Sequence, residues 1–291
     1  MVMRYITTLI FVVVASCVGY SLYSTYDSNP WTRDGQVRAY IVEVTPRVTG
    51  QVTNVLIKDN SQVKKGDLLF EIDQSVYQAA LNKAKASQKQ ASALLKKARD
   101  EERRAVNLEK RAPGAVPVLT LNNLGNAVET ARANVEVMQA AVEEAALNLQ
   151  FTKVYAPTDG YITNLQLRQG SQVTANTPVV ALIDEHSFWI EGFFKETDLK
   201  GVDDSNQTLV TLLSHSEYVL EGQITSIGYG ISMQDGSTGN SLLPVVNPNF
   251  EWIRLAQRIP VKVKLTSVPD DVQLRIGMTA SVKIMKGSES K

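Results

Sequence analysis

The stretch that decides the fold is written twice: Gly50–Asp73 reads GQVTNVLIKDNSQVKKGDLLFEID, and Gly160–Asp184 reads GYITNLQLRQGSQVTANTPVVALID. At a constant offset of 110 residues, Ser61-Gln62-Val63 aligns with Ser171-Gln172-Val173. Both copies are rich in Val and Ile with turn residues between the runs, which indicates short β-strands. Neither copy is long enough to bury a core alone. The repeat therefore predicts one split β-sandwich, built from residues 42–73 and 155–184.

Glycines mark the expected turns of the two copies. Gly50, Gly66 and Gly160 stand between or before the Val- and Ile-rich runs. Glycine adopts positive φ without a steric penalty, so tight turns favour it. We predict that these three glycines are structural turns on which the sandwich depends.

The insertion between the copies, residues 75–150, has helical periodicity. Its second arm carries apolar residues at spacings that alternate four and three, which is typical of a coiled-coil seam. The first arm follows the same spacing from Tyr77, with Gln88 and Glu102 as polar exceptions. Pro113 and Pro117 predict a break between the arms, and hence an antiparallel helical hairpin with its tip at about residues 111–123. The seam of the second arm is Leu124, Val128, Ala131, Val135, Met138, Val142, Ala145 and Leu149.

The two arms differ in charge. Residues 75–111 hold ten Lys/Arg and four Asp/Glu, a net charge of +6, whereas residues 112–150 hold one Arg and four Glu, a net charge of −3. Opposite net charges favour pairing of the two arms with each other. We expect attraction across the seam.

The tip of the hairpin combines apolar and polar residues at the end of a projecting arm. Exposed apolar groups in such a place are typical of a docking surface. The residues predicted to dock a partner are Val116, Val118, Leu119, Thr120 and Leu121.

The N-terminus contains 22 consecutive uncharged residues, 5–26. This length spans a bilayer, which takes about 20 helical residues, and we predict an uncleaved transmembrane anchor. Arg4 precedes it, which favours a cytoplasmic N-terminus with the bulk of the chain outside the cytoplasm. Two alternatives stay open. One is a cleaved signal peptide, and the other a lipoprotein signal ending at Cys17, where Val14-Ala15-Ser16-Cys17 resembles a lipobox.

Residues 186–286 return to short alternating runs, which predict a small antiparallel β-barrel, with a further strand from residues 34–43. The formal net charge is zero, so nothing favours nucleic acid as a partner. A single cysteine and two distant histidines, His186 and His215, do not form a metal-binding pattern. No nucleophile–base pair or phosphate loop is present in the sequence. We expect a protein that is not an enzyme and uses no cofactor.

The repeat resembles the half-motifs of biotinyl and lipoyl carrier domains, most closely in Val63-Lys64-Lys65-Gly66-Asp67. A working carrier joins its halves at a hairpin that holds the modified lysine. Here the halves are separated by the helical insertion, so a carrier function is disfavoured.

The order of anchor, half-sandwich, helical hairpin, half-sandwich and barrel resembles the periplasmic adaptor (membrane fusion protein) family, the HlyD/EmrA-like group. The most specific stretches are residues 156–160 (APTDG), 188–202 (FWIEGFFKETDLKGV) and 275–284 (RIGMTASVKI). Residues 30–34 (PWTRD) and 250–261 (FEWIRLAQRIPV) are similar to the adaptors of p-hydroxybenzoic acid efflux pumps. The tip departs from a pattern of Arg, Leu and Ser found in many such adaptors. Arg104 and Leu108 fit it, but residue 115 is Ala.

The resemblance implies a non-catalytic adaptor that joins an inner-membrane transporter to an outer-membrane channel and exports small molecules, including aromatic carboxylic acids or drugs. It also implies self-association into a ring, often a hexamer, on a single-pass inner-membrane protein with its bulk in the periplasm. The alternatives are an adaptor of an ABC-driven secretion system and an envelope scaffold that assembles through its hairpin.

Overall fold

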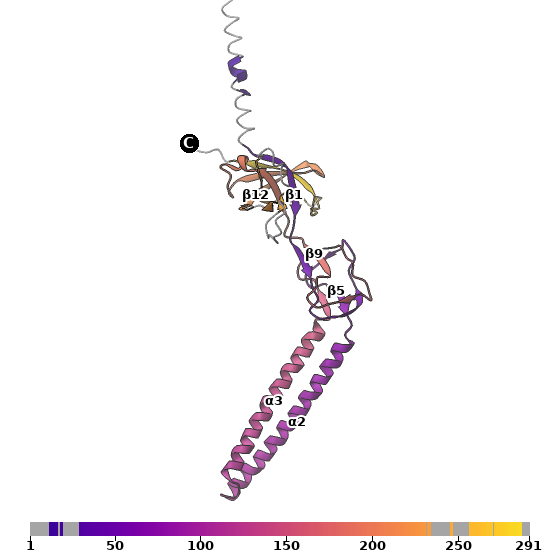
Figure 1. The fold of residues 1–291 in the computed structure, drawn as a ribbon, viewed down its shortest axis with the longest axis vertical. Coiled ribbons are helices and arrows are strands. Elements are labelled where there is room, and N and C mark those ends of the chain that lie inside the picture. Colours follow the sequence, from indigo (N-terminus) through magenta and orange to yellow (C-terminus); the bar gives the residue numbers. More distant parts are fainter. Residues whose placement is uncertain are drawn as a thin grey trace, which may run out of the picture. The chain divides into compact units, whose positions relative to one another are not determined.

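The computed structural model describes residues 12–16, 18–19, 29–230, 232–233, 245–246, 256–269 and 271–286. The chain divides into two compact units (Figure 1). One unit comprises Met1–Tyr40 and Glu185–Lys291, and the other comprises Ile41–Asp184. The second unit is therefore an insertion into the first.

The first unit is a closed antiparallel β-barrel, as the alternating runs predicted. Its inward side chains are apolar, and Ile190, Phe194 and Ile284 are almost completely buried. The short helix η1 (Glu196–Leu199) follows β10, and β13 (Ser232–Met233) pairs with β14 (Val245–Val246) in parallel. Around the barrel the strands are β1 (Trp31–Arg38), β10 (Trp189–Lys195), β15 (Arg258–Leu265), β12 (His215–Ile227), β11 (Gln207–Leu212) and β16 (Thr279–Met285).

The barrel strand expected from residues 34–43 has different bounds. It is β1, which begins at Trp31 and ends at Arg38. The following residues, Ile41–Val44, form β2 in the other unit, where they pair with Val180–Asp184. One extended stretch thus supplies strands to both units.

The β part of the second unit is a sandwich of two four-stranded sheets, and the predicted split sandwich is confirmed. Each sheet takes strands from both copies of the repeat, so neither copy forms a sheet by itself. The core between the sheets includes Leu69, Phe70, Ile162 and Leu182, all fully buried. One sheet is β2 (Ile41–Val44), β9 (Val180–Asp184), β7 (Gly160–Thr163) and β4 (Gln62–Val63); the other is β6 (Lys153–Tyr155), β5 (Leu68–Ile72), β3 (Gly50–Val55) and β8 (Gln172–Val173).

The two copies hold each other through reciprocal hydrogen bonds. The Val52 amide donates to the Ser171 carbonyl at 2.8 Å. The Ile162 amide, 110 residues after Val52, donates to the Ser61 carbonyl at 2.9 Å. Because the same bond is made in both directions, the sequence repeat is a structural repeat, and each copy completes the other.

The three glycines predicted to form turns differ in backbone conformation. Gly66 has a positive φ of 91°, as its predicted turn requires. Its counterpart in the second copy, Asn176, also has a positive φ, 62°. The prediction is wrong for Gly50 and Gly160, which begin strands β3 and β7 and do not have positive φ.

Gly50 and Gly160 are instead required by close approach. A Cβ on Gly160 would lie 2.0 Å from the carbonyl oxygen of Ile183 on the neighbouring strand. A Cβ on Gly50 would lie 2.6 Å from Cγ2 of Ile72. Both positions therefore favour glycine for a steric rather than a torsional reason, most strictly at Gly160, where the obstacle is backbone.

The inserted segment is an antiparallel helical hairpin of α2 (Ser75–Arg111) and α3 (Val118–Gln150), which run side by side in Figure 1. Asp73 lies two residues before the start of α2, and its carboxylate accepts hydrogen bonds from the Ser75 amide and hydroxyl, which lowers the pKa of Asp73. Along α3, Val128 is buried and the other seven seam residues are half-buried. Leu81, Ala91 and Leu95 are the buried residues of α2.

Side chains from the sandwich hold the base of the hairpin. The hydroxyl of Tyr77, in the first turn of α2, donates to the Thr49 carbonyl at 2.7 Å. The Arg47 guanidinium lies 4.7 Å from the centre of the Phe151 ring, just after α3. Both contacts come from residues just before the first copy of the repeat, so the start of α2 and the end of α3 are tied to the same segment of the sandwich.

Charge does not join the two arms as expected. Across residues 75–150, all of which the structure describes, each ion pair lies within one helix: Lys97–Glu101, Arg103–Asp100 and Arg132–Glu129. Packing of the seam, rather than ion pairs, holds α2 against α3.

The anchor expected over residues 5–26 lies largely outside the described residues. Only 12–16 and 18–19 of this segment are described, and they are helical. In the described part of the chain, no helix has the length and apolar character needed to cross a membrane.

Candidate docking site at the tip of the helical hairpin

The tip is a six-residue loop, residues 112–117, between the end of α2 and the start of α3. The Ala112 amide continues the helix by donating to the Leu108 carbonyl at 2.9 Å. Gly114 then reverses the chain with a φ of 85°. Pro117 directly precedes α3, where a missing amide proton does no harm because the first amides of a helix lack intrahelical acceptors.

One carboxylate organises this loop. Oε1 of Glu109 accepts a hydrogen bond from the Gly114 amide at 2.7 Å, and Oε2 accepts one from the Val116 amide at 2.9 Å. These bonds favour the charged form and lower the pKa of Glu109. The sequence analysis missed this role, although a glutamate one helical turn before Pro113-Gly114 was a usable signal.

The predicted docking residues lie partly in the loop and mostly in the first turn of α3. Val118 and Leu119 are 73% and 71% exposed, and Thr120 is also exposed. Val116 and Leu121 are half-buried. Leu108, at the end of α2, adds further exposed apolar surface nearby. The structure therefore presents Val118 and Leu119 most openly, and no residue of the set is in the hydrophobic core.

An open groove of about 430 Å³ lies at the other end of the hairpin. Its walls come from both helices and are mostly apolar, and they also include Lys83 and Glu144. The apolar lining residues are Val76, Tyr77, Ala80, Ala84, Met138, Ala141 and Ala145.

The described part of the chain does not bring metal-binding side chains together. No cluster of three or more His, Cys, Asp or Glu residues suited to a metal ion lies there. Asp271 accepts a hydrogen bond from the Tyr218 hydroxyl at 2.6 Å, which raises the pKa of Tyr218. That contact joins strand β12 to a loop of the barrel.

The chain combines a split sandwich, a closed barrel and a helical hairpin with an exposed tip, an architecture that fits an adaptor protein. Family models support this. Residues 40–185 match "RND MFP, barrel-sandwich hybrid domain", and residues 187–285 match "AAEA-like beta-barrel domain". The chain belongs to the membrane fusion protein (MFP) family, whose members are adaptors without catalytic activity.

Similar proteins agree with this assignment. The chain is 38% identical to "Uncharacterized protein YdhJ" of Escherichia coli (strain K12), over 97% of each chain. It is similar in fold to the membrane fusion protein Spr0693 from Streptococcus pneumoniae R6, with a TM-score of 0.65, 14% identity and coverage of 89% of this chain and 99% of that one.

Two further structures contain a MacA protein. MacA from Actinobacillus actinomycetemcomitans has a TM-score of 0.60 and 23% identity, with coverage of 89% of this chain and 80% of that one. A MacA-MexA chimera with the hairpin of Pseudomonas aeruginosa MexA has a TM-score of 0.56 and 25% identity, with coverage of 89% and 82%.

Proposed function

We propose that this chain is the adaptor subunit of a bacterial efflux system and that its hairpin tip docks against an outer-membrane channel. The observation that carries the proposal is the tip itself. Val118 and Leu119 expose apolar side chains at the far end of a hairpin whose base is fixed to a sandwich. Apolar side chains in such a position gain from being covered by a partner.

The remaining parts have roles consistent with this proposal. The uncharged segment 5–26 would anchor the chain in the inner membrane, with the bulk of the protein in the periplasm. The barrel would contact an inner-membrane transporter, which supplies the energy from a proton gradient or from ATP. Several copies would assemble into a ring, so that their hairpins together form a conduit.

The exported compounds are small molecules, and aromatic carboxylic acids are our first candidates. The similarity of residues 30–34 and 250–261 to adaptors of p-hydroxybenzoic acid pumps supports this choice.

The test is an efflux assay in cells that lack the native chain. The double variant Leu119→Asp/Leu121→Asp should abolish export of p-hydroxybenzoate because two charges at the tip oppose apolar docking. A matched control is Leu94→Asp, which places a charge on the shaft of α2 at a residue that is 50% exposed. Unchanged export by the tip variant, at an unchanged level of membrane-bound protein, would refute docking through the tip.

A further inference from the structure

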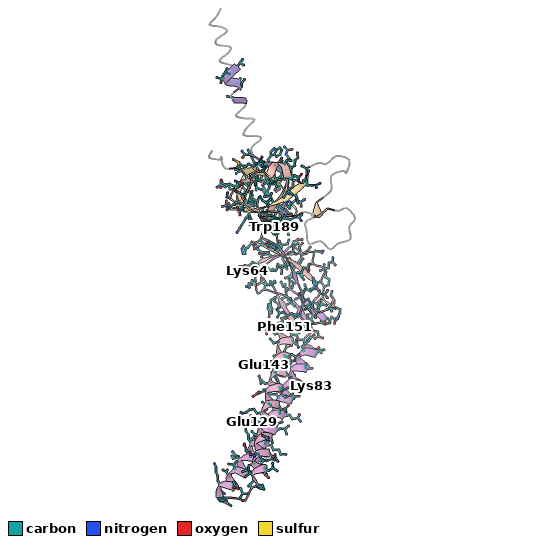
Figure 2. All side chains as sticks on the ribbon, turned by 60° about the vertical axis from the view of Figure 1, so that its left-hand side comes forward. Lys64, Lys83, Glu129, Glu143, Phe151 and Trp189 are labelled. Carbon is teal, nitrogen blue, oxygen red and sulfur yellow. The ribbon has the colours of Figure 1, made fainter. Side chains whose placement is uncertain are left out.

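The outer edges of the two helices carry opposite charges that form no ion pair between α2 and α3. On α2, Lys89 and Lys96 each follow a seam position by one residue; on α3, Glu129 and Glu136 do the same. A step of one residue turns a side chain by roughly 100° about the helix axis, away from the seam. In Figure 2, Lys83 of α2 and Glu129 and Glu143 of α3 lie toward opposite sides of the hairpin.

These charges are available for a partner. All four residues are exposed. Within residues 75–150, Glu129 has a neighbouring cation, Arg132, 3.6 Å away on its own helix. In that fully described segment, no ion pair involves Lys89, Lys96 or Glu136.

The charges also stand at matching heights along the hairpin. The side chains of Gln88 and Gln139 are hydrogen-bonded across the seam, and Glu102 faces Gly125. In both pairs the residue numbers add up to 227. Because the helices are antiparallel, any residue of α2 and residue of α3 whose numbers add up to 227 lie at the same height along the hairpin. Lys89 is therefore level with residue 138, and Lys96 with residue 131. Glu136 and Glu129 lie two residues from those positions, about 3 Å along the helix axis and within reach of a lysine side chain.

Alanines lie on the side of each helix that faces away from the other helix, next to these charged residues. Ala86 and Ala93 on α2 stand nearly level with Ala140 and Ala133 on α3, and all four are exposed. Alanine lets the backbones of two helices come close together. The outer edge of α2 is therefore complementary in charge, height and shape to the outer edge of α3.

We infer that neighbouring copies of this chain assemble with the outer edge of α2 against the outer edge of α3 of the next copy, joined by Lys89–Glu136 and Lys96–Glu129. The inference rests on the proposed adaptor role, in which several hairpins stand side by side. Because the two edges differ, each copy keeps one free edge of each kind. Such a head-to-tail contact propagates from copy to copy and closes into a ring.

A charge exchange tests the contact in the full-length protein, purified in detergent. Lys89→Glu/Lys96→Glu should weaken self-association by about tenfold in sedimentation velocity, since like charges then face each other at both positions. Glu129→Lys/Glu136→Lys should do the same. The chain with all four substitutions should recover assembly, because the pairs are restored with opposite polarity. Association of the unaltered chain should weaken as salt is raised.

The matched control is Lys85→Glu/Arg99→Glu, which makes the same change in charge on α2 at residues beside the seam rather than on its outer edge. It should leave association unchanged, and circular dichroism should show equal helix content in every variant. Failure of the fourfold exchange to restore assembly, or an equal loss in the control, would overturn the inference. In a Cys17→Ala background, Lys89→Cys/Glu136→Cys should form disulfides between copies, and their absence in an assembled protein would also overturn it. These readouts do not involve export, so they separate this inference from the proposed function.

Discussion

The steric requirement at Gly160 leads to a quantitative prediction about the sandwich. In Gly160→Ala, the new Cβ would lie 2.0 Å from the Ile183 carbonyl oxygen, and also 2.9 Å from its carbonyl carbon. Real Cβ contacts stay above 3.0 Å, so β7 and β9 have to separate. Gly160 and Tyr161 pair with Asp184 and Ile183 in this ladder. Loss of one or two ladder hydrogen bonds plus a disturbed core should cost roughly 3 kcal/mol of unfolding free energy.

The equivalent substitution in the other copy provides the comparison. In Gly50→Ala the Cβ would meet only a methyl group, Cγ2 of Ile72, at 2.6 Å. A buried methyl group can shift more easily than a backbone carbonyl. We therefore expect a smaller loss for Gly50→Ala, about 1–2 kcal/mol, which is typical of an overpacked core.

Urea denaturation can separate the two units because their probes differ. All three tryptophans, Trp31, Trp189 and Trp252, lie outside residues 41–184, whereas both long helices lie inside that range. Gly160→Ala should lower the midpoint seen by far-ultraviolet circular dichroism by roughly 1 M or more. The tryptophan transition should change little. A larger loss in Gly50→Ala than in Gly160→Ala, or a shift confined to the tryptophan signal, would refute the steric argument.

Four further substitutions test three local features. Gly66→Ala forces a positive φ of 91° on a residue with a side chain, so it should lower the free energy of unfolding by about 1 kcal/mol. Asn176→Gly, at the equivalent turn, should leave the free energy of unfolding almost unchanged in the same denaturation experiment. Gly125→Ala should stabilise the hairpin by about 1 kcal/mol, because the site is inside α3 and the nearest atom to the new Cβ is 3.7 Å away; a loss of helix stability would contradict this. The pKa of Glu109 is lowered by its bonds to the loop, so the order that it gives to the tip is complete above the ordinary glutamate pKa and is lost as the pH falls through its lowered value. Amide exchange at Gly114 and Val116 should show this dependence, and Glu109→Gln should lack it.

Most of the fold could be predicted from the sequence because each part has its own pattern of residues. The repeat at an offset of 110 predicted the split sandwich, and the four-three spacing from Leu124 predicted α3 and its seam. The prolines located the tip, but the loop is shorter than the predicted 111–123, because α3 begins at Val118, directly after Pro117.

The errors concern spatial relations that a linear pattern does not record. Gly50 and Gly160 were assigned to turns, because a glycine needed for close approach looks the same in sequence as one needed for positive φ. The net charges of the arms suggested attraction across the seam, but net charge does not say which side of a helix the charges occupy. The role of Glu109 depends on a loop that folds back onto the preceding helix, and its one signal in the sequence is the position of a glutamate one helical turn before Pro113-Gly114.

The most direct test of the adaptor account is photo-crosslinking from the hairpin in growing cells. A photoreactive amino acid at Leu119, and in a separate chain at Leu94 as the control, would report what each site touches. The account predicts an adduct between Leu119 and an outer-membrane channel protein, identified by mass spectrometry, and no such adduct from Leu94. Absence of a channel adduct from Leu119, in cells where the chain supports export, would contradict the account.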